Sequence, residues 1–260
     1  MAERILVKTS DGQELSVRVS GSGDPILVLH GWMMSGAVWD SMFLSLDSQG
    51  RKFIVPDQRG TGASSRTGTD YSLAQHASDL IAVLDATETK SAIVLGHSMG
   101  GQLALYLAAH YPERVRAVMA LNPVPPAGLP LPPDATGLFR TSAGDRGKQS
   151  IILGLACKSL AEDEKNRILD LAGAVSAASI EGAFDAWVAG GFADKMSAIK
   201  APVLVLATDD PFLPPPFLRE SIVSKVARGR LALLKGAGHY PQCEKPEETA
   251  ALVEAFLAAT

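Results

Sequence analysis

The sequence predicts an α/β fold with a mostly parallel central sheet, helices on both faces and an inserted helical segment. First, short apolar runs alternate with helical segments as far as residue 122, and parallel strands are joined by such crossover helices. Second, residues 123–200 begin with a proline-rich stretch and contain no convincing strand. Third, strand-like runs return after residue 200. We therefore expect a core of residues 1–122 and 201–260 and an inserted helical cap of residues 123–200.

Composition limits the class of protein. The chain has 260 residues, of which 47% are hydrophobic, so it can bury a large core. Its net charge of −4 and the lack of a basic run argue against nucleic-acid binding. The longest apolar runs fall far short of the roughly 20 residues that a membrane span requires. Because the N-terminus has no apolar signal core, we expect a cytoplasmic protein with no membrane partner.

The two cysteines, Cys157 and Cys243, form neither a disulfide framework nor a metal-ligand spacing. We interpret both as free thiols and expect no metal site. The expected partner is a small-molecule substrate. The sequence leaves the oligomeric state open, with a homodimer as one option.

The first part of the chain contains the strands and turns that begin the sheet. Residues 14–19 alternate apolar and polar side chains, so one face of that strand is buried, and Asp11-Gly12 is a hairpin turn signal. Residues 25–29 are apolar throughout, which is typical of a central strand covered on both faces. The elements expected up to residue 72 are strands at 5–8, 14–19, 25–29 and 53–55 and a helix at 37–47.

Two polar features of this region have a structural and a functional interpretation. His30 follows the central strand, and we favour a packed, hydrogen-bonded histidine over an acid–base catalyst, because a better-placed base comes later in the chain. Asp57 and Arg59 belong to the turn-rich loop of residues 56–65. We favour an ion pair between them that pins the loop over an active-site acid.

An amphipathic helix follows this loop. Ser72 and Gln75 have the spacing of a capping box, Ser-x-x-Gln, which predicts a helix that starts at residue 73. Its apolar residues recur on one face, at positions 73, 77, 80, 81 and 84. The helix leads into an apolar strand at residues 91–95.

The most specific motif comes directly after that strand. Residues 96–101 read Gly-His-Ser-Met-Gly-Gly, so Ser98 lies in a Gly-x-Ser-x-Gly sequence between a buried strand and an Ala- and Leu-rich helix. A serine alcohol is a weak nucleophile that must be held where a base can reach it. A tight strand-to-helix corner holds it there, and Gly96 and Gly100 avoid a side-chain clash at the corner. The first amides of the helix point toward an oxyanion formed at the serine.

The second half of the chain supplies the inserted segment and the last strands. The prolines between Pro123 and Pro133 are expected to exclude regular helix or strand there. In the helical part that follows, aromatic residues either line a pocket from above or form the segment's own core; they are Phe139, Phe184, Trp187 and Phe192. The other expected elements are strands at 114–121, 201–207 and 231–234 and helices at 151–160, 162–171, 180–188, 217–226 and from Pro246 onward.

Three chemically distinct side chains follow the ends of predicted parallel strands: Ser98, an aspartate at 209 or 210, and His239. Ligands bind outside the carboxyl ends of such strands, so these groups are expected at one site. Their order along the chain, Ser, Asp, His, is that of a nucleophilic triad. Because adjacent side chains in the extended segment before Pro211 point to opposite sides, only one of the two aspartates can face His239.

With these stretches in this order, the chain resembles the α/β-hydrolase fold superfamily over essentially its whole length. The resemblance rests on His30-Gly31-Trp32, Asp57-Gln58-Arg59-Gly60, residues 96–101, Asp210-Pro211 with Pro214, and Gly238-His239 with Glu244 and Pro246. It implies the α/β-hydrolase fold with a helical cap, of the serine esterase, lactonase and C–C hydrolase type.

The resemblance also implies a role for individual residues. The nucleophile would be Ser98, the general base His239, and the acid that orients the base Asp210, because the family has this acid three positions after a small residue, here Ala207. The remaining expected site residues are the backbone amides of Trp32 and Met99 as the oxyanion hole and Met33, Phe139 and Trp187 as substrate contacts.

Some positions depart from the family pattern or exclude a subfamily. Ala207 stands where the family often has glycine, and Thr61 replaces a frequent histidine or aromatic residue. Neither departure changes a residue of the triad, but they leave the subfamily undecided. Ser98 excludes haloalkane dehalogenases and epoxide hydrolases of this fold, which use an aspartate nucleophile at that position.

The sequence therefore predicts a cofactor-independent serine hydrolase that cleaves small to medium carboxylic esters through an acyl-enzyme. A lactonase or a C–C bond hydrolase with the same triad is the nearest alternative, and a ligand-binding receptor of the same fold with little turnover is another. A C–C hydrolase commonly needs a cationic anchor. The candidates are Arg140, Arg146, Lys148 and Lys158, for each of which we favour surface solvation. Fold alone does not fix the substrate.

Overall fold

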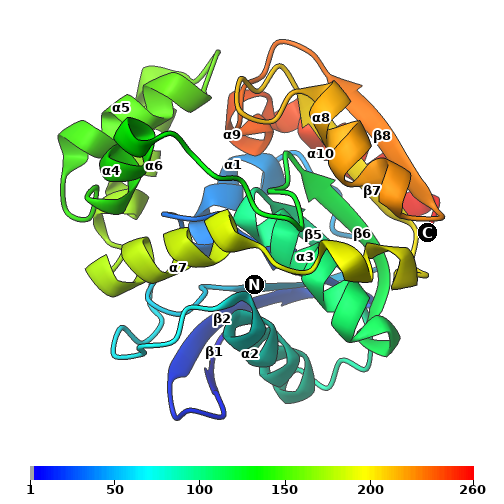
Figure 1. The fold of residues 1–260 in the computed structure, drawn as a ribbon. Coiled ribbons are helices and arrows are strands. Elements are labelled where there is room, and N and C mark those ends of the chain that lie inside the picture. The colour runs from blue at the N-terminus through cyan, green and yellow to red at the C-terminus, as the bar shows by residue number, and fades with distance from the viewer. Residues whose placement is uncertain (1–2) are drawn as a thin grey trace.

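The computed structural model describes residues 3–260. Its central sheet has eight strands: β1 (Glu3–Lys8), β2 (Glu14–Gly21), β3 (Asp24–Leu29), β4 (Arg51–Pro56), β5 (Ala92–His97), β6 (Val115–Leu121), β7 (Val203–Thr208) and β8 (Gly229–Leu234). Their spatial order is β1-β2-β4-β3-β5-β6-β7-β8 (Figure 1). β2 pairs antiparallel with β1 and β4, and the other neighbouring strands pair in parallel. The predicted α/β fold with a mostly parallel sheet is confirmed.

The two strands at the centre of the sheet are covered on both faces. Val28 of β3 lies beside Leu95 of β5, and every residue of β5 is buried. Strands of this kind need helices on each side of the sheet. One face carries α2 (Leu73–Ala86) and α3 (Met99–His110), and the other carries α1 (Asp40–Phe43), α9 (Pro241–Glu244) and α10 (Pro246–Ala258) (Figure 1).

The segment between β6 and β7 is helical and contains none of the sheet's strands. Its α-helices are α4 (Pro133–Arg140), α5 (Arg146–Ala156), α6 (Glu162–Gly173) and α7 (Ala177–Ala189), drawn in green to yellow in Figure 1. The expectation that the prolines exclude a helix there is wrong for α4, which begins at Pro133. Proline is favoured at the first position of a helix, because an amide there would have no partner within the helix.

Two predicted helices are shorter than expected. Residues 36–39 form a 3₁₀ turn, and α1 adds only one turn before the chain leaves the helix at Leu44. Turn-forming Ser, Asp and Gly residues follow at 45–50 and compete with helix formation. Near the end of the chain, α8 (Pro215–Ser221) is separated from a 3₁₀ turn at Val223–Lys225 by the β-branched Ile222, which has φ −127° and ψ −63°.

The helix α2 is capped by only half of the predicted capping box. Ser72 Oγ accepts a hydrogen bond from Gln75 N at 3.2 Å, as expected for the N-cap. The side chain of Gln75 does not return to Ser72. It donates from Nε2 to Asp79 Oδ1 at 3.0 Å and thereby joins a buried network around Arg59.

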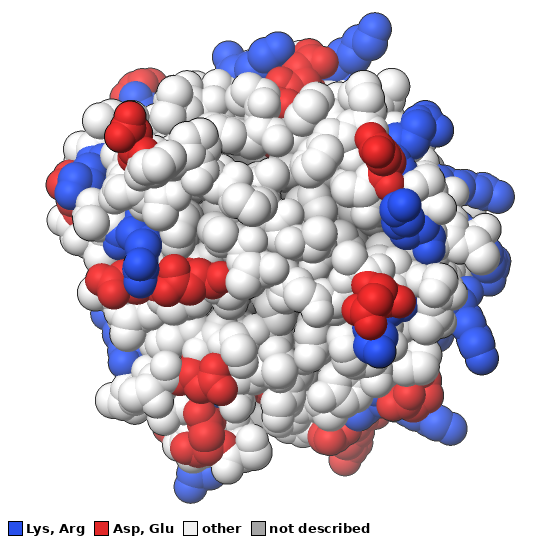
Figure 2. All heavy atoms as spheres, viewed as in Figure 1, with Lys and Arg blue, Asp and Glu red and all other residues white. Residues whose placement is uncertain are grey.

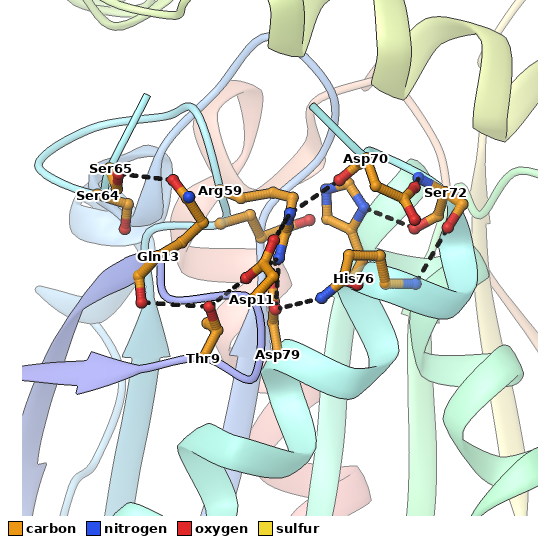
Figure 3. A network of polar contacts seen from close by, with 12 residues as sticks. Thr9, Asp11, Gln13, Arg59, Ser64, Ser65, Asp70, Ser72, His76 and Asp79 are labelled. Carbon is orange, nitrogen blue, oxygen red and sulfur yellow. Dashed lines mark hydrogen bonds and ion pairs between the residues drawn. The ribbon is translucent and has the colours of Figure 1, made fainter. Parts of the chain in front are cut away.

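The network around Arg59 fixes the loop between β4 and α2 (Figure 3). The Arg59 side chain has no exposed surface and binds both carboxylate oxygens of Asp79 at 2.7 Å. It also contacts Asp11 Oδ2 at 3.0 Å and donates to Asp70 O at 2.8 Å. The guanidinium of Arg59 holds the pKa of Asp11 at about 2. A planar guanidinium suits such a set of acceptors.

The predicted ion pair between Asp57 and Arg59 is wrong. Asp57 accepts hydrogen bonds from Gly36 N at 2.8 Å and Ala63 N at 3.0 Å, and its cationic neighbour is Arg4 at 3.5 Å. The loop is pinned as expected, but each of the two charged residues has its own partners on other elements.

This loop also supports the inserted segment. Gly60 O accepts a hydrogen bond from Ser176 N at 3.0 Å, and Arg59 O accepts one from Ser179 Oγ at 3.3 Å. Gly60 has φ +77°, and a Cβ there would lie 2.5 Å from Ser179 Cβ. The start of α7 therefore rests directly on the loop that Arg59 fixes.

Replacing Arg59 by glutamine should destabilise the whole fold. The substitution leaves Asp79, with only 3% of its side chain exposed, without its cation. Breaking a buried pair in this way costs about 3–5 kcal/mol. We expect a correspondingly lower urea midpoint for Arg59→Gln. The exposed Arg66→Gln in the same loop is the control, and equal stability of the two variants would contradict this account.

Candidate active site

Ser98 lies at a sharp corner between β5 and α3. Its backbone has φ 55° and ψ −120°, a combination that an L-residue rarely adopts. A Cβ on Gly96 would lie 2.2 Å from Gly100 O, and one on Gly100 would lie 2.4 Å from Leu29 O. The two glycines of the motif are therefore required by the close approach of β5, α3 and β3.

Asp210 and His239 meet beyond the ends of β7 and β8. Asp210 Oδ2 lies 2.6 Å from His239 Nδ1, and the Asp210 side chain is fully buried. Its other oxygen accepts a hydrogen bond from Phe212 N at 2.9 Å, which fixes the orientation of the carboxylate. With Nδ1 as the donor to Asp210, Nε2 of His239 remains free to accept a proton.

The neighbouring Asp209 points away from His239. Its Oδ2 accepts a hydrogen bond from Gly236 N at 2.9 Å and lies 3.7 Å from Lys158 Nζ. The Gly236 amide and, to a smaller extent, the nearby lysines lower the pKa of Asp209. The structure thus brings Asp210 to the histidine and leaves Asp209 as a residue that stabilises the turn.

Two residues that the sequence did not single out for this purpose hold the backbone of His239. His239 O lies 2.8 Å from His97 Nε2 and accepts a hydrogen bond from Asn122 Nδ2 at 3.1 Å. Asn122 also donates to Thr208 Oγ1 and Gly238 O. In the sequence, His97 is the unspecified residue before the serine in Gly-x-Ser-x-Gly, and Asn122 follows a predicted strand. The sequence feature that could have pointed to both is a polar side chain at the end of a buried strand.

The two residues whose amides are expected to form the oxyanion hole are neighbours of Ser98: Met99 follows it in the chain, and Trp32 lines the same cavity. Met99 is the first residue of α3, so its amide has no acceptor in the helix. Gly31, which precedes Trp32, would place a Cβ 3.1 Å from Ser98 Cβ, so this loop touches the serine. Within residues 3–260, neither Trp32 N nor Met99 N donates a hydrogen bond to another residue. Both amides are free to bind an oxygen that develops negative charge.

His30 is a packed histidine, as expected. It is buried, its Nδ1 lies 2.8 Å from Gly31 O, and its Nε2 accepts a hydrogen bond from Gln58 N at 3.0 Å. Burial lowers the pKa of His30 to about 4. Its neutral ring links the oxyanion loop to the loop of residues 56–65.

Ser98 and His239 line the same cavity, which has a volume of about 50 Å³, room for only a few water molecules. Phe139 and Trp187 of the inserted segment also line it, and Phe139 stacks on Trp32 with ring centroids 5.4 Å apart. The other lining residues are Val124, Leu129, Leu131, Ile152, Ala156, Phe212, Leu213 and Tyr240. In the described part of the chain, no Lys, Arg, Asp or Glu lines this cavity.

Met33, which is expected to contact substrate, and two of the aromatic residues that are left open between pocket and core, lie away from the Ser98 cavity. Met33 has φ +65° and is 1% exposed. It lines a separate space of about 10 Å³ behind the oxyanion loop, so the prediction that it contacts substrate is not supported by its position. Phe184 packs on Trp187 at 4.9 Å, and Phe192 packs on Tyr106 at 5.1 Å. Neither lines the cavity of Ser98.

The four cations considered as anchors for a charged substrate pair with acidic side chains or carbonyl groups outside the cavity. The pairs are Arg140–Asp185 at 2.9 Å, Arg146–Asp170 at 2.6 Å, Lys148–Asp145 at 3.7 Å and Lys158–Asp209 at 3.7 Å. Their partners are all at least two-fifths exposed in their side chains, in agreement with the favoured role in surface solvation.

Three further features bear on the class of site. Cys157 and Cys243 are both free thiols. Over residues 3–260 no group of three or more His, Cys, Asp and Glu side chains is arranged to hold a metal ion. Within the same range no helix has the length and apolar character needed to cross a membrane.

Comparison with known proteins agrees with the fold. A family model described as alpha/beta hydrolase fold matches residues 24–143, which include β3, the corner at Ser98 and α4. A non-heme haloperoxidase of Rhodococcus erythropolis is 27% identical over 261 residues, and the match covers 90% of this chain and 92% of that protein.

Two solved structures have the same architecture. An esterase from Exiguobacterium antarcticum matches with a TM-score of 0.90 at 22% identity, over 98% of this chain and 100% of that one, which shows a shared fold. Est816, described as an N-acyl homoserine lactone degrading enzyme, matches with a TM-score of 0.81 at 28% identity, over 97% of this chain and 100% of that one.

Stability should fall when the pH drops below about 6.5, the pKa of an unperturbed histidine. Burial lowers the pKa values of His30, His76 and His97 in the folded protein. The unfolded chain therefore binds protons more readily, and the stabilisation present above pH 6.5 is lost as the pH falls toward about 4. The urea midpoint at pH 5.0 should be lower than at pH 7.5, with a smaller difference in His30→Gln. A midpoint independent of pH over this range would contradict the burial of neutral histidines.

Proposed function

We propose, from the premise that this chain belongs to the α/β-hydrolase fold superfamily, that it is a serine hydrolase that cleaves small to medium carboxylic esters. The observation that carries the proposal is the 2.6 Å contact between Asp210 Oδ2 and His239 Nδ1 at the wall of a cavity that Ser98 also lines. A nucleophile, a base and an acid that orients the base are the parts required for acyl transfer.

In the proposed mechanism, Ser98 Oγ attacks the carbonyl carbon of the ester. His239 Nε2 takes the serine proton while Asp210 stabilises the imidazolium through Nδ1–H. The negative charge that develops on the carbonyl oxygen is bound by the amides of Trp32 and Met99. His239 then gives its proton to the leaving alcohol, and an acyl-enzyme remains on Ser98.

The second half of the cycle uses the same residues. His239 takes a proton from a water molecule, which attacks the acyl carbon. The tetrahedral intermediate collapses, Ser98 recovers its proton from His239, and the carboxylic acid leaves. Every step requires only groups of this chain and water.

The cavity favours an uncharged, apolar acyl group. Its walls are aromatic and aliphatic, and its polar side chains are the proposed catalytic pair together with Tyr240 and the indoles of Trp32 and Trp187. On the face seen in Figure 2, charged side chains lie mostly toward the edges and the middle is uncharged. A carboxylate-bearing substrate of a C–C hydrolase would lack a cation in this cavity, and this disfavours that alternative.

A lactone is a second candidate substrate. The same steps open a cyclic ester, with the alcohol retained in the product. The observation that favours it is the match, at 28% identity over nearly the whole chain, to an enzyme described as degrading N-acyl homoserine lactones. Rates of hydrolysis on a panel of acyclic esters, lactones and diketones separate these substrate classes. The same panel tests a binding role, because a receptor would release at most one equivalent of product per chain and would not turn over.

Ser98→Ala should abolish hydrolysis of every active member of that panel. We expect kcat to fall by roughly 10⁴ to 10⁶, the scale of triad knockouts. The variant should fold normally, because it removes one hydroxyl, and circular dichroism checks this. Activity that survives in Ser98→Ala would contradict the serine-hydrolase proposal.

The two adjacent aspartates provide a matched pair of variants. Asp210→Asn should lower kcat by about 10⁴, because a triad aspartate holds the tautomer of the histidine and stabilises its charged form. Asp209→Asn keeps an oxygen that can accept from the Gly236 amide and loses only an exposed ion pair with Lys158, so it should lower kcat less than about tenfold. If both variants fold and Asp209→Asn is the less active one, the acid that orients His239 is Asp209. If both keep nearly full activity, that acid is neither of these two residues.

The aromatic residues of the inserted segment should set the preferred acyl length. Phe139→Ala and Trp187→Ala enlarge a cavity of about 50 Å³, so kcat/KM should shift toward longer acyl chains in a series of p-nitrophenyl esters. Phe192→Ala is the control, because this buried aromatic of the same segment packs on Tyr106 instead. The same acyl preference in all three variants as in the wild type would show that these residues form only the segment's own core.

A further inference from the structure

One carboxylate connects the loop that carries His239 to the inserted segment. Glu244, the last residue of α9, accepts four backbone hydrogen bonds. Its Oε2 accepts from Lys158 N at 2.7 Å, Ser159 N at 2.9 Å and Gly238 N at 2.8 Å, and its Oε1 accepts from Tyr240 N at 3.0 Å. Two of these amides follow α5 in the inserted segment, and the other two flank His239.

The two segments also touch each other directly. His239 N donates to Ala156 O at 2.8 Å, and Ser159 Oγ donates to Gly236 O at 3.1 Å. A Cβ on Gly238 would lie 2.4 Å from Ala156 O and 2.9 Å from Cys157 Cα. The two backbones are therefore packed against each other with no room for a side chain between them.

The carboxylate is matched to these donors. An ionised carboxylate is an acceptor only, with no hydrogen of its own to clash with an N–H donor. Here it meets four amides, three at Oε2 and one at Oε1. Hydrogen bonds to an ionised acceptor are roughly twice as strong as neutral ones. Each bond on one segment therefore supports the bonds on the other, because all of them share the single side chain of Glu244.

This connection reaches the site through the backbone of His239. Its amide has its acceptor on the inserted segment, Ala156 O, and its carbonyl is bound by His97 and Asn122 on the core. Ala156 lines the cavity together with His239. Movement of the end of α5 would remove the acceptor of the His239 amide and change the angle at which the imidazole meets Asp210.

We propose that Glu244 is a positioning residue that makes the alignment of His239 depend on the docking of residues 156–159 against the loop of residues 236–240. The proposal rests on the hydrolase function proposed above. It assigns to Glu244 no contact with the substrate. Its effect is to hold the base in line only while the inserted segment is in place.

The test combines kinetics with the NMR signal of the His239 Nδ1 proton. Glu244→Gln keeps the size of the side chain but removes its charge and places an NH₂ group against an amide donor. Gly238→Ala leaves Glu244 intact and forces the two segments apart. In both variants kcat should fall by roughly ten- to a hundredfold, the effect of a displacement of about 1 Å in a catalytic group. KM should change less than about threefold, because the aromatic walls of the cavity, Trp32, Phe139 and Trp187, carry none of the substitutions.

The downfield signal of the proton between His239 and Asp210 should broaden or shift in both variants, and amide exchange at Lys158 and Tyr240 should accelerate. Glu248→Gln is the control, because it removes a nearby exposed carboxylate whose salt-bridge partner is Lys245, at 3.1 Å. It should match the wild type in every measurement.

The outcomes separate the two proposals. An unchanged Nδ1 proton signal in folded Glu244→Gln and Gly238→Ala overturns the positioning role, whatever the activity of the enzyme. A lower melting temperature with wild-type kcat in both variants also overturns it, because Glu244 would then act on stability alone. If instead the signal changes as expected while Ser98→Ala keeps full activity, the positioning role stands and the serine-hydrolase function fails.

Discussion

The backbone of Ser98 is held at φ 55° and ψ −120°, a conformation that costs an L-residue of the order of 1–3 kcal/mol. The surrounding bonds determine it: Ser98 N donates to Leu121 O at 2.9 Å, and Ser98 O accepts from Gly101 N at 2.9 Å and from Val124 N at 3.2 Å. The corner therefore ties β5, β6 and α3 together. Because Gly96 and Gly100 carry no side chains, β3 also comes within contact, and its end delivers the loop that holds Trp32 beside the serine.

The other parts of the site lie at the same edge of the sheet because they follow parallel strands. β7 and β8 pair in register from Val203 with Gly229 to Thr208 with Leu234, so the loops after them start side by side. Asp210 and His239 then need only short loops to meet. Their meeting requires that the strand ends keep fixed positions. The hydrogen bond from Asn122 Nδ2, just after β6, to Thr208 Oγ1 at the end of β7, 2.8 Å long, helps to hold two of these ends together.

The inserted segment is attached to the core at two places within its helical part, after α5 and at the start of α7. The start of α7 rests on the loop that Arg59 fixes, through Ser176 and Ser179. Trp32 Nε1 adds a bond to Ile180 O at 2.8 Å, which joins α7 to the oxyanion loop. The end of α5 is attached through Glu244 to the loop of His239. Closure of the cavity and alignment of the proposed catalytic groups therefore depend on the same contacts.

Much of this arrangement is visible in the sequence because it is local. The Gly-x-Ser-x-Gly corner, the alternation of strands and helices, and a histidine after the last strand are short-range patterns with a direct physical cause. The partners of Arg59 cannot be predicted in this way. Asp11 and Asp79 are remote from it in sequence, and only the tertiary fold brings them to one guanidinium. The same holds for Glu244 and Asn122, whose bonds join segments about 80 to 120 residues apart. The helix α4 was not predicted for a different reason. Proline disrupts the interior of a helix but is favoured in its first turn, and Pro133 is the first residue of α4.

The proposed mechanism requires that His239 and Asp210 activate Ser98 as a nucleophile. It is tested most directly by treating the purified protein with a fluorophosphonate and measuring its intact mass, followed by peptide mapping. We expect one adduct per chain on Ser98, no adduct in Ser98→Ala, and much slower labelling in Asp210→Asn than in Asp209→Asn. An adduct on another residue, or no adduct in the folded wild-type protein, would contradict it.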